Sequence, residues 1–129
     1  MTNSTFSSNF AISYAAGLTL YDTARGWLRG ARFVRNRAQE AGAGMRLQTR
    51  CTAFLDDVFM ADNAVPGEDV GVGAGAAIYT VDDSHLTANN LRITRTRAGI
   101  GAVYFAGGCA TPLPLYPFSS NFLAAARTS

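Results

Sequence analysis

One short pattern recurs along the chain: an aromatic or aliphatic residue followed three positions later by asparagine or a similar polar residue. FSSN occurs at 6–9 and 118–121, FVRN occurs at 33–36, and FMAD (59–62) and ITRT (93–96) are weaker copies. The copies begin at intervals of 27, 26, 34 and 25 residues, with the first residues Phe6, Phe33, Phe59, Ile93 and Phe118. A period of this length is typical of folds built from stacked repeats.

A second pattern lies between the copies, where a glycine precedes a short apolar stretch with a large apolar residue at the third position. The glycines are Gly17, Gly44, Gly75 and Gly101, and the apolar residues are Leu20, Leu47, Ile78 and Tyr104. Glycine suits a position where the backbone takes a positive φ or packs tightly. We therefore expect one interior column led by phenylalanine and another of leucine, isoleucine and tyrosine.

Short alternating runs at this period predict an all-β fold, a right-handed parallel β-helix of about four to five coils. In such a fold, strands of successive coils lie about 4.7–4.9 Å apart, so equivalent side chains stack. Asparagine suits a stacked turn because its amide both donates and accepts hydrogen bonds. We expect residues 1–129 to form a single domain, part of a longer solenoid. The Pro/Gly/acid segment at 65–72 predicts a protruding loop.

Residues 23–40 also allow a helical interpretation. Apolar residues from Ala24 to Ala38 fall at helical spacing, and arginines occupy other positions around the wheel. However, Gly26 and Gly30 lie inside this segment, and each costs about 1 kcal/mol relative to alanine in a helix. The recurrence of the repeat favours strands here, with a helix as the alternative.

The repeat brings one arginine-rich phrase back to the same position. RFVRNRA occupies 32–38 and RITRTRA occupies 92–98, so three arginines recur at offsets −1, +2 and +4 from Phe33 and from Ile93. These offsets face outward if the phenylalanine and asparagine positions face inward. The six residues are Arg32, Arg35, Arg37, Arg92, Arg95 and Arg97.

Stacking would place the two arginine groups two coils, or roughly 10 Å, apart on one surface. The coil between them is expected to present Val58, Ala61 and Asn63, which carry no charge. Guanidinium groups bind sulfate and carboxylate in bidentate geometry, so this surface is a candidate site for anionic glycans. The alternative is a solvated face that Asp57 and Asp62 help to neutralise.

The only cluster that combines acids with the single histidine is VDDSH at 81–85. Asp82 and Asp83, with His85 and a nearby Arg92, allow comparison with polysaccharide-cleaving enzymes that use paired acids. Asp-Asp-Ser is also ordinary turn chemistry. Asp56-Asp57 and Glu68-Asp69 resemble calcium-binding acids only loosely, and turn acids are the better interpretation. We predict no metal and no cofactor.

The combination F-x-x-N-x-A followed by a Gly-Ala-aliphatic step resembles the repeat of chlamydial polymorphic outer membrane proteins, clearest in FMADNA (59–64) and GAGAAIY (73–79). The resemblance covers roughly residues 5–123. The chain departs from the family in never showing its double glycine followed by alanine. The resemblance implies a surface-displayed, often adhesive solenoid with a pectin-lyase-like fold and no catalytic residues.

Composition limits the remaining function classes. A net charge of +2 is too small to predict a nucleic-acid partner, and no apolar run approaches the 18–20 or so residues that span a membrane. The first ten residues do not resemble a secretory signal. Cys51 and Cys109 are expected two coils apart, too far to form a disulfide.

The sequence therefore predicts a non-catalytic β-helix module, displayed on a cell surface or secreted, that serves in adhesion or binds an anionic glycan. Its expected partners are an anionic polysaccharide or a cell-surface receptor, besides further coils of a longer chain. A polysaccharide-processing, pectin-lyase-like enzyme is the alternative.

Overall fold

A computed structural model describes residues 1–66, 73–106, 115–118 and 124–127, and the side chains of 1–66 and 73–105. All regular structure in these residues is β-strand, and no helix occurs among them. The predicted all-β class is confirmed. The helical alternative for residues 23–40 is wrong, because that segment contains the strands β4 (Arg25–Arg29), β5 (Arg32–Val34) and β6 (Arg37–Ala38).

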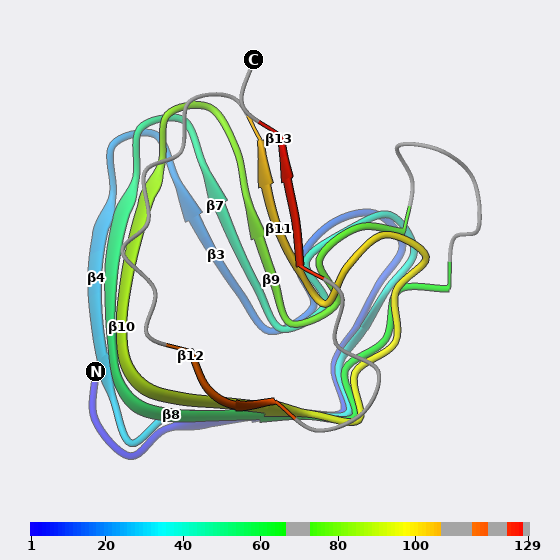
Figure 1. The fold of residues 1–129 in the computed structure, drawn as a ribbon, viewed down its shortest axis with the longest axis horizontal. Coiled ribbons are helices and arrows are strands. Elements are labelled where there is room, and N and C mark those ends of the chain that lie inside the picture. The colour runs from blue at the N-terminus through cyan, green and yellow to red at the C-terminus, as the bar shows by residue number, and fades with distance from the viewer. Residues whose placement is uncertain (67–72, 107–114, 119–123, 128–129) are drawn as a thin grey trace.

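The strands form three sheets in which every pair of neighbours is parallel (Figure 1). The first sheet consists of β4, β5 and four further strands: β1 (Thr5–Ser7), β8 (Thr52–Ala61), β10 (His85–Thr94) and β12 (Leu115–Phe118). The second contains β3 (Leu18–Tyr21), β7 (Met45–Gln48), β9 (Ile78–Thr80), β11 (Val103–Ala106) and β13 (Ala124–Arg127). The third pairs β2 (Phe10–Ala11) with β6.

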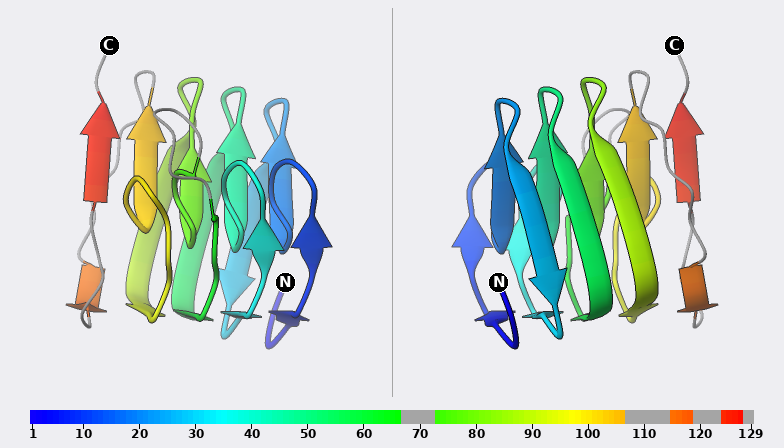
Figure 2. Two further views of the ribbon diagram at one scale, coloured as in Figure 1. Left: turned by 90° about the vertical axis from the view of Figure 1, so that its right-hand side faces the viewer. Right: turned by 90° about the vertical axis from the view of Figure 1, so that its left-hand side faces the viewer.

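The chain visits the sheets in a fixed order, so each pass lies beside the previous one (Figure 2). After β6, the third sheet continues only as isolated parallel bridges, from Arg37 to Ala64 and from Ala64 to Arg97. The first sheet bends at one position in each pass, where Asn3, Gly30, Asp57 and Asn90 have positive φ. We call this bend the corner; it divides the outer surface of the first sheet into two parts.

The register corrects one part of the predicted repeat. Phe6 pairs with Phe33, Phe33 with Met60, Met60 with Ile93, and Ile93 with Phe118. The third copy therefore begins at Met60, which is fully buried, whereas Phe59 faces outward between Arg32 and Arg92. The prediction that Phe59 occupies the interior column is wrong, because a shift of one residue moves every side chain of a strand to the opposite face.

The asparagine position explains why the register is fixed at Met60. Asn63, three residues after Met60, accepts hydrogen bonds at its Oδ1 from the backbone N–H and the Nδ2 of Asn36, both at 3.1 Å. Its own Nδ2 donates to the carbonyl oxygen of Phe33 at 2.9 Å. Asn36 makes the same contacts with Asn9 and Phe6. Asp62 could not fill this buried position, because a carboxylate only accepts and would bury a charge.

The second predicted pattern also shifts in the later copies. Ile78 pairs with Met45 rather than with Leu47, and Tyr104 pairs with Tyr79 on the outer surface. The predicted Leu/Ile/Tyr column is therefore wrong beyond Leu47.

Glycine has two separate roles at the turns before the strands of the second sheet. Gly42, Gly75 and Gly101 take positive φ at equivalent turn positions, whereas a Cβ at Gly44 would meet the carbonyl oxygen of Ala77.

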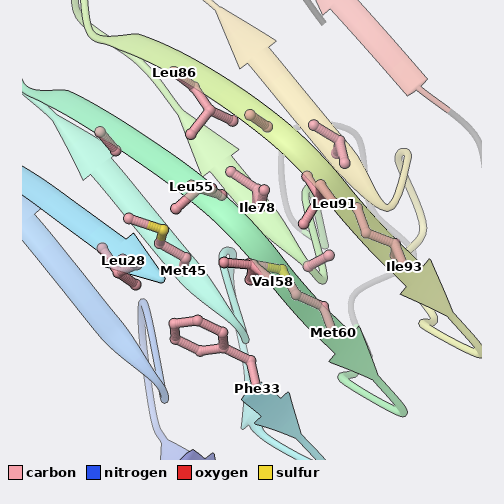
Figure 3. Packing of buried hydrophobic residues seen from close by; sticks show 14 of the residues in the cluster. Leu28, Phe33, Met45, Leu55, Val58, Met60, Ile78, Leu86, Leu91 and Ile93 are labelled. Carbon is pink, nitrogen blue, oxygen red and sulfur yellow. The ribbon is translucent and has the colours of Figure 1, made fainter. Parts of the chain in front are cut away.

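The core lies between the first and second sheets (Figure 3). Each inward position of the first sheet carries an apolar residue in successive passes, as in Leu28 and Leu55 or in Val58 and Leu91. The second sheet contributes Met45, Ile78 and Val103, all fully buried. Phe6 stacks on Phe33 with ring centroids 4.7 Å apart. This rigid scaffold fixes which side chains meet on the outside.

The flanking register locates the extra residues of the third pass. Arg37 and Ala41 are four positions apart in the sequence, but their partners Ala64 and Ala74 are ten positions apart. The predicted loop at 65–72 falls in this interval. Val65 is buried, Pro66 is exposed, and residues 67–72 lie outside the described residues.

Candidate functional site

The six arginines singled out in the sequence follow the corner in the chain, and all six are exposed. Arg32 lies on the first sheet, Arg37 lies on the third sheet, and Arg35 lies at the turn between them, so the arginines line a surface that continues around this turn. They form three rows with the residues of the pass between them. The rows are Arg32–Phe59–Arg92, Arg35–Asp62–Arg95 and Arg37–Ala64–Arg97. We call this surface the arginine face. The expected middle residues Val58, Ala61 and Asn63 are wrong, because the same one-residue shift turns each of them inward.

The central row is held by an ion pair. Arg35, Asp62 and Arg95 all have positive φ, at 57°, 56° and 49°. Arg95 donates to Asp62 through Nε at 2.7 Å and through Nη2 at 2.9 Å, a bidentate contact. This hydrogen bond, together with the charges of Arg95 and Arg35, lowers the pKa of Asp62 from its ordinary value. Asp62 therefore neutralises part of the face, as the solvated-face alternative expects.

In the first row, the side chain of Phe59 separates two arginines. The guanidinium carbon of Arg32 lies 5.2 Å from the centre of the Phe59 ring, within the range of a cation–π contact. A hollow of about 450 Å³ opens here between Arg32, Arg92 and the corner residue Asp57. The ring orders Arg32 without neutralising it.

In the third row, the short side chain of Ala64 leaves the space between two arginines open. Arg37 and Arg97 lie two strand spacings apart, about 10 Å. A hollow of about 520 Å³ is lined by these two arginines together with Arg35, Asp62 and Pro66. Because three arginines and one acid border this hollow, against two arginines and one acid in the first row, it is the part of the arginine face best suited to an anion.

Asp82 and Asp83 lie in the turn between β9 and β10, where both are exposed and both have positive φ. His85 begins β10, and its Nδ1 lies 2.9 Å from the carbonyl oxygen of Asp83. Arg92 lies beyond the corner, toward the other end of the same strand, so the structure does not bring it beside the two acids. The arrangement is that of a turn.

Both acids of the Asp56-Asp57 pair have partners in the structure. Asp56 accepts from Arg29 and Asn89, and Asp57 accepts from Asn90. Among the residues described, no group of three or more histidine, cysteine or acidic side chains could hold a metal ion. Glu68-Asp69 and Cys109 lie outside the described residues, and Cys51 is buried as a free thiol.

A second group of side chains, which was not predicted from the sequence, lies on the N-terminal side of the corner. Trp27 stacks on Phe54, and the next outward row contains Arg29, Asp56 and Asn89. The signal was present, because Trp27 and Phe54 are separated by the same 27 residues as Phe6 and Phe33, and so are Arg29 and Asp56.

No family model matches the chain, and neither a curated protein nor a solved structure matches it. The described residues contain no helix of the length and apolar character needed to cross a membrane.

Proposed function

We propose that the chain is a right-handed parallel β-helix module of about four to five coils. Parallel pairing at separations of 21 to 33 residues, with a fixed order of visits to three sheets, supports this architecture. Crossovers between parallel strands of one sheet are right-handed in nearly all proteins, which supports the handedness. Such modules expose long, regular surfaces and keep their loops on one side.

We further propose that this module is non-catalytic and binds an extended polyanion, such as a sulfated or carboxylated glycan, on the arginine face. One observation carries the proposal: six exposed arginines lie in three adjacent rows whose middle pass contains a single acid, Asp62. Guanidinium groups suit sulfate and carboxylate because they present two parallel donors.

The geometry favours an extended ligand over a single small anion. The two arginine groups stand about 10 Å apart, so only a chain with several negative groups reaches both. Its binding should weaken steeply with salt, because exposed charges are screened over about 8–10 Å at physiological ionic strength. Surface display or secretion and a role in adhesion follow from the resemblance to the polymorphic outer membrane protein repeat, and they form part of the same proposal.

Heparin binding tests the proposal with a variant matched in charge. Arg37→Ser with Arg97→Ser removes two guanidinium groups from the open row, and Arg25→Ser with Arg50→Ser removes two exposed ones elsewhere. At about 1 kcal/mol for each exposed contact, the first pair should weaken heparin binding by more than ten-fold. The second pair should change it little, with circular dichroism as the check on folding.

Asp62→Asn should have the opposite effect on heparin binding. It removes the one acid of the three rows and frees Arg95 from its bidentate contact, so heparin retention should increase. Equal losses from the two arginine pairs would show that heparin responds only to net charge, and the absence of any gain from Asp62→Asn would show that heparin does not contact the three rows. The proposed binding function would then be wrong.

A further inference from the structure

A second groove lies on the first sheet, on the N-terminal side of the corner. One wall consists of Trp27, Phe54 and Thr87, which face outward from neighbouring strands. The other wall consists of Arg29, Asp56 and Asn89, two residues further along the same strands. The groove between them has a volume of about 470 Å³. Outward residues two apart on a strand stand roughly 6.6 Å from each other, which is wide enough for one ring of a ligand.

The aromatic wall is unusually exposed. Trp27 is 59% exposed and Phe54 is 38% exposed, although the ring centroids stack at 5.5 Å with an angle of 11° between planes. Because Phe54 covers one face of the indole, the exposure of Trp27 arises from its other face and its edges. Large apolar side chains of this kind are energetically costly in water and dominate binding sites where a ligand covers them.

The polar wall is fixed in place before any ligand arrives. Asp56 accepts from the Nε of Arg29 at 2.8 Å and from the Nδ2 of Asn89 at 2.9 Å. The hydrogen bond from Arg29 contributes most to lowering the pKa of Asp56, so the carboxylate stays ionised at neutral pH. Arg29 uses only Nε in this contact, which leaves its two Nη groups directed to solvent.

We propose that this groove binds an uncharged pyranose ring of a glycan chain. A pyranose has an apolar face of C–H groups, which suits the free face of an indole, and a rim of hydroxyl groups, which both donate and accept. Arg29 donates, Asp56 accepts and Asn89 does both, so one wall meets each kind of hydroxyl contact. A groove that is largely apolar with a few convergent polar groups is the usual form of a small-molecule site.

The charged groups of the groove already have partners, which favours a neutral ligand. Arg29 and Asp56 compensate each other, the Met1 ammonium donates to the carbonyl oxygen of Trp27 at 2.9 Å, and Asn89, Thr87 and Thr2 carry no charge. An anionic group would meet the carboxylate of Asp56, and a cation would meet the guanidinium of Arg29. The groove therefore differs in kind from the arginine face, and the proposal does not depend on that face.

The single tryptophan of the chain provides a direct test. The probes are hexasaccharides of β-1,4-linked glucose, xylose, mannose and N-acetylglucosamine, titrated separately while Trp27 fluorescence is recorded. At least one should give a saturable change in emission. The affinity of that hexasaccharide should change by less than about two-fold between physiological and 1 M salt, because the ligand carries no charge that salt could screen.

Variants separate the groove from the rest of the surface. Phe54→Ala and Asp56→Asn should each weaken the bound hexasaccharide by about ten-fold, and Phe54→Tyr should restore binding, because it returns a ring to the wall. Trp27→Ala, followed by calorimetry, should abolish binding. Tyr21→Ala is the matched control, because Tyr21 is a similarly exposed aromatic residue on the second sheet. Circular dichroism verifies that each variant is folded.

Three results would overturn the proposal. The first is the absence of any emission change with all four hexasaccharides, and the second is unchanged binding in Phe54→Ala. The third is a concentration-dependent dimer, detected by sedimentation, that Trp27→Ala abolishes, since a second copy of the chain would then cover the groove. Loss of heparin binding in the arginine-face variants leaves this test unaffected, so the two proposals fail separately.

Discussion

Two adjacent columns at one turn follow opposite rules. The inward column stacks Asn9, Asn36 and Asn63, and each amide bonds to the next. The outward column, one residue earlier, stacks Arg35, Asp62 and Arg95, so the sign of charge alternates. The two columns share the same backbone path and the same strand spacing. They differ only in their access to water.

This difference shows how burial selects the residue at each repeat position. Inside, an identical residue can recur, because an amide donates to one neighbour and accepts from the other, and no water is available to replace either bond. Outside, identical charges would repel at a spacing of about 4.8 Å, whereas opposite charges or a neutral spacer remove that cost. At this turn, repetition of asparagine therefore marks the buried position, and alternation of charge marks the exposed one.

The largest expected effect on stability comes from placing a carboxylate in the inward column, compared with placing an amide in the outward column. Asn63→Asp should destabilise the fold by about 3–5 kcal/mol, because it removes the donor to Phe33 and buries a charge without a partner. Asp62→Asn, one residue away, should change stability by less than about 1 kcal/mol, because the ion pair that it removes is exposed. Urea denaturation of both variants measures the difference.

A similar cost for the two substitutions would contradict the assignment of Asn63 to the interior. Asn63→Ala supplies the control for charge, because it removes all three side-chain hydrogen bonds of Asn63 without adding a carboxylate. It should fall between the two variants.

The next effect compares two neighbouring apolar residues that the sequence alone confuses. Met60→Ala should cost about 2–4 kcal/mol, because Met60 is fully buried in the core. Phe59→Ala should cost only about 0.5–1 kcal/mol, since Phe59 faces outward and its main charged contact is with Arg32. Thermal unfolding in the calorimeter ranks the two variants. The reverse order would restore Phe59 to the interior column.

The smallest expected effect is a pH dependence of the outward column. The pKa of Asp62 is lower in the folded protein than its ordinary value of 3.8, so the ion pair with Arg95 stabilises the fold above that value. This contribution is lost as the pH falls through the lowered pKa. The difference in Tm between the wild type and Asp62→Asn should therefore be present near neutral pH and disappear in strong acid. If this difference in Tm increased on acidification, it would contradict the lowered pKa of Asp62.

Much of the fold could be predicted because the repeat leaves identical residues at fixed intervals. Phe6 and Phe33, Asn9 and Asn36, and the two arginine groups all occur where the period places them. The error at Phe59 arose because Phe59 and Met60 are both large and apolar, so hydrophobicity alone does not separate them. The distinction lay in Asp62 and Asn63, since only the amide can satisfy the buried position.

The candidate site was predicted less completely. The sequence identified the six arginines that form the three rows. It expected Val58 and Ala61 between them, where the structure has Phe59 and Asp62. It did not identify the groove beside Trp27. That groove combines residues from four passes of the chain, and no short stretch contributes more than three of them.

The sequence by itself determined the period, the strand character and the identity of the residues that recur, because stacking demands the same chemistry at each inward position. Only the tertiary structure decided the register of the third pass and the corner at Gly30, Asp57 and Asn90. Those two features determine which outward side chains become neighbours. The physical reason is that inward residues must each satisfy the same packing and hydrogen bonds, whereas outward residues are constrained only by the neighbours that the register brings to them.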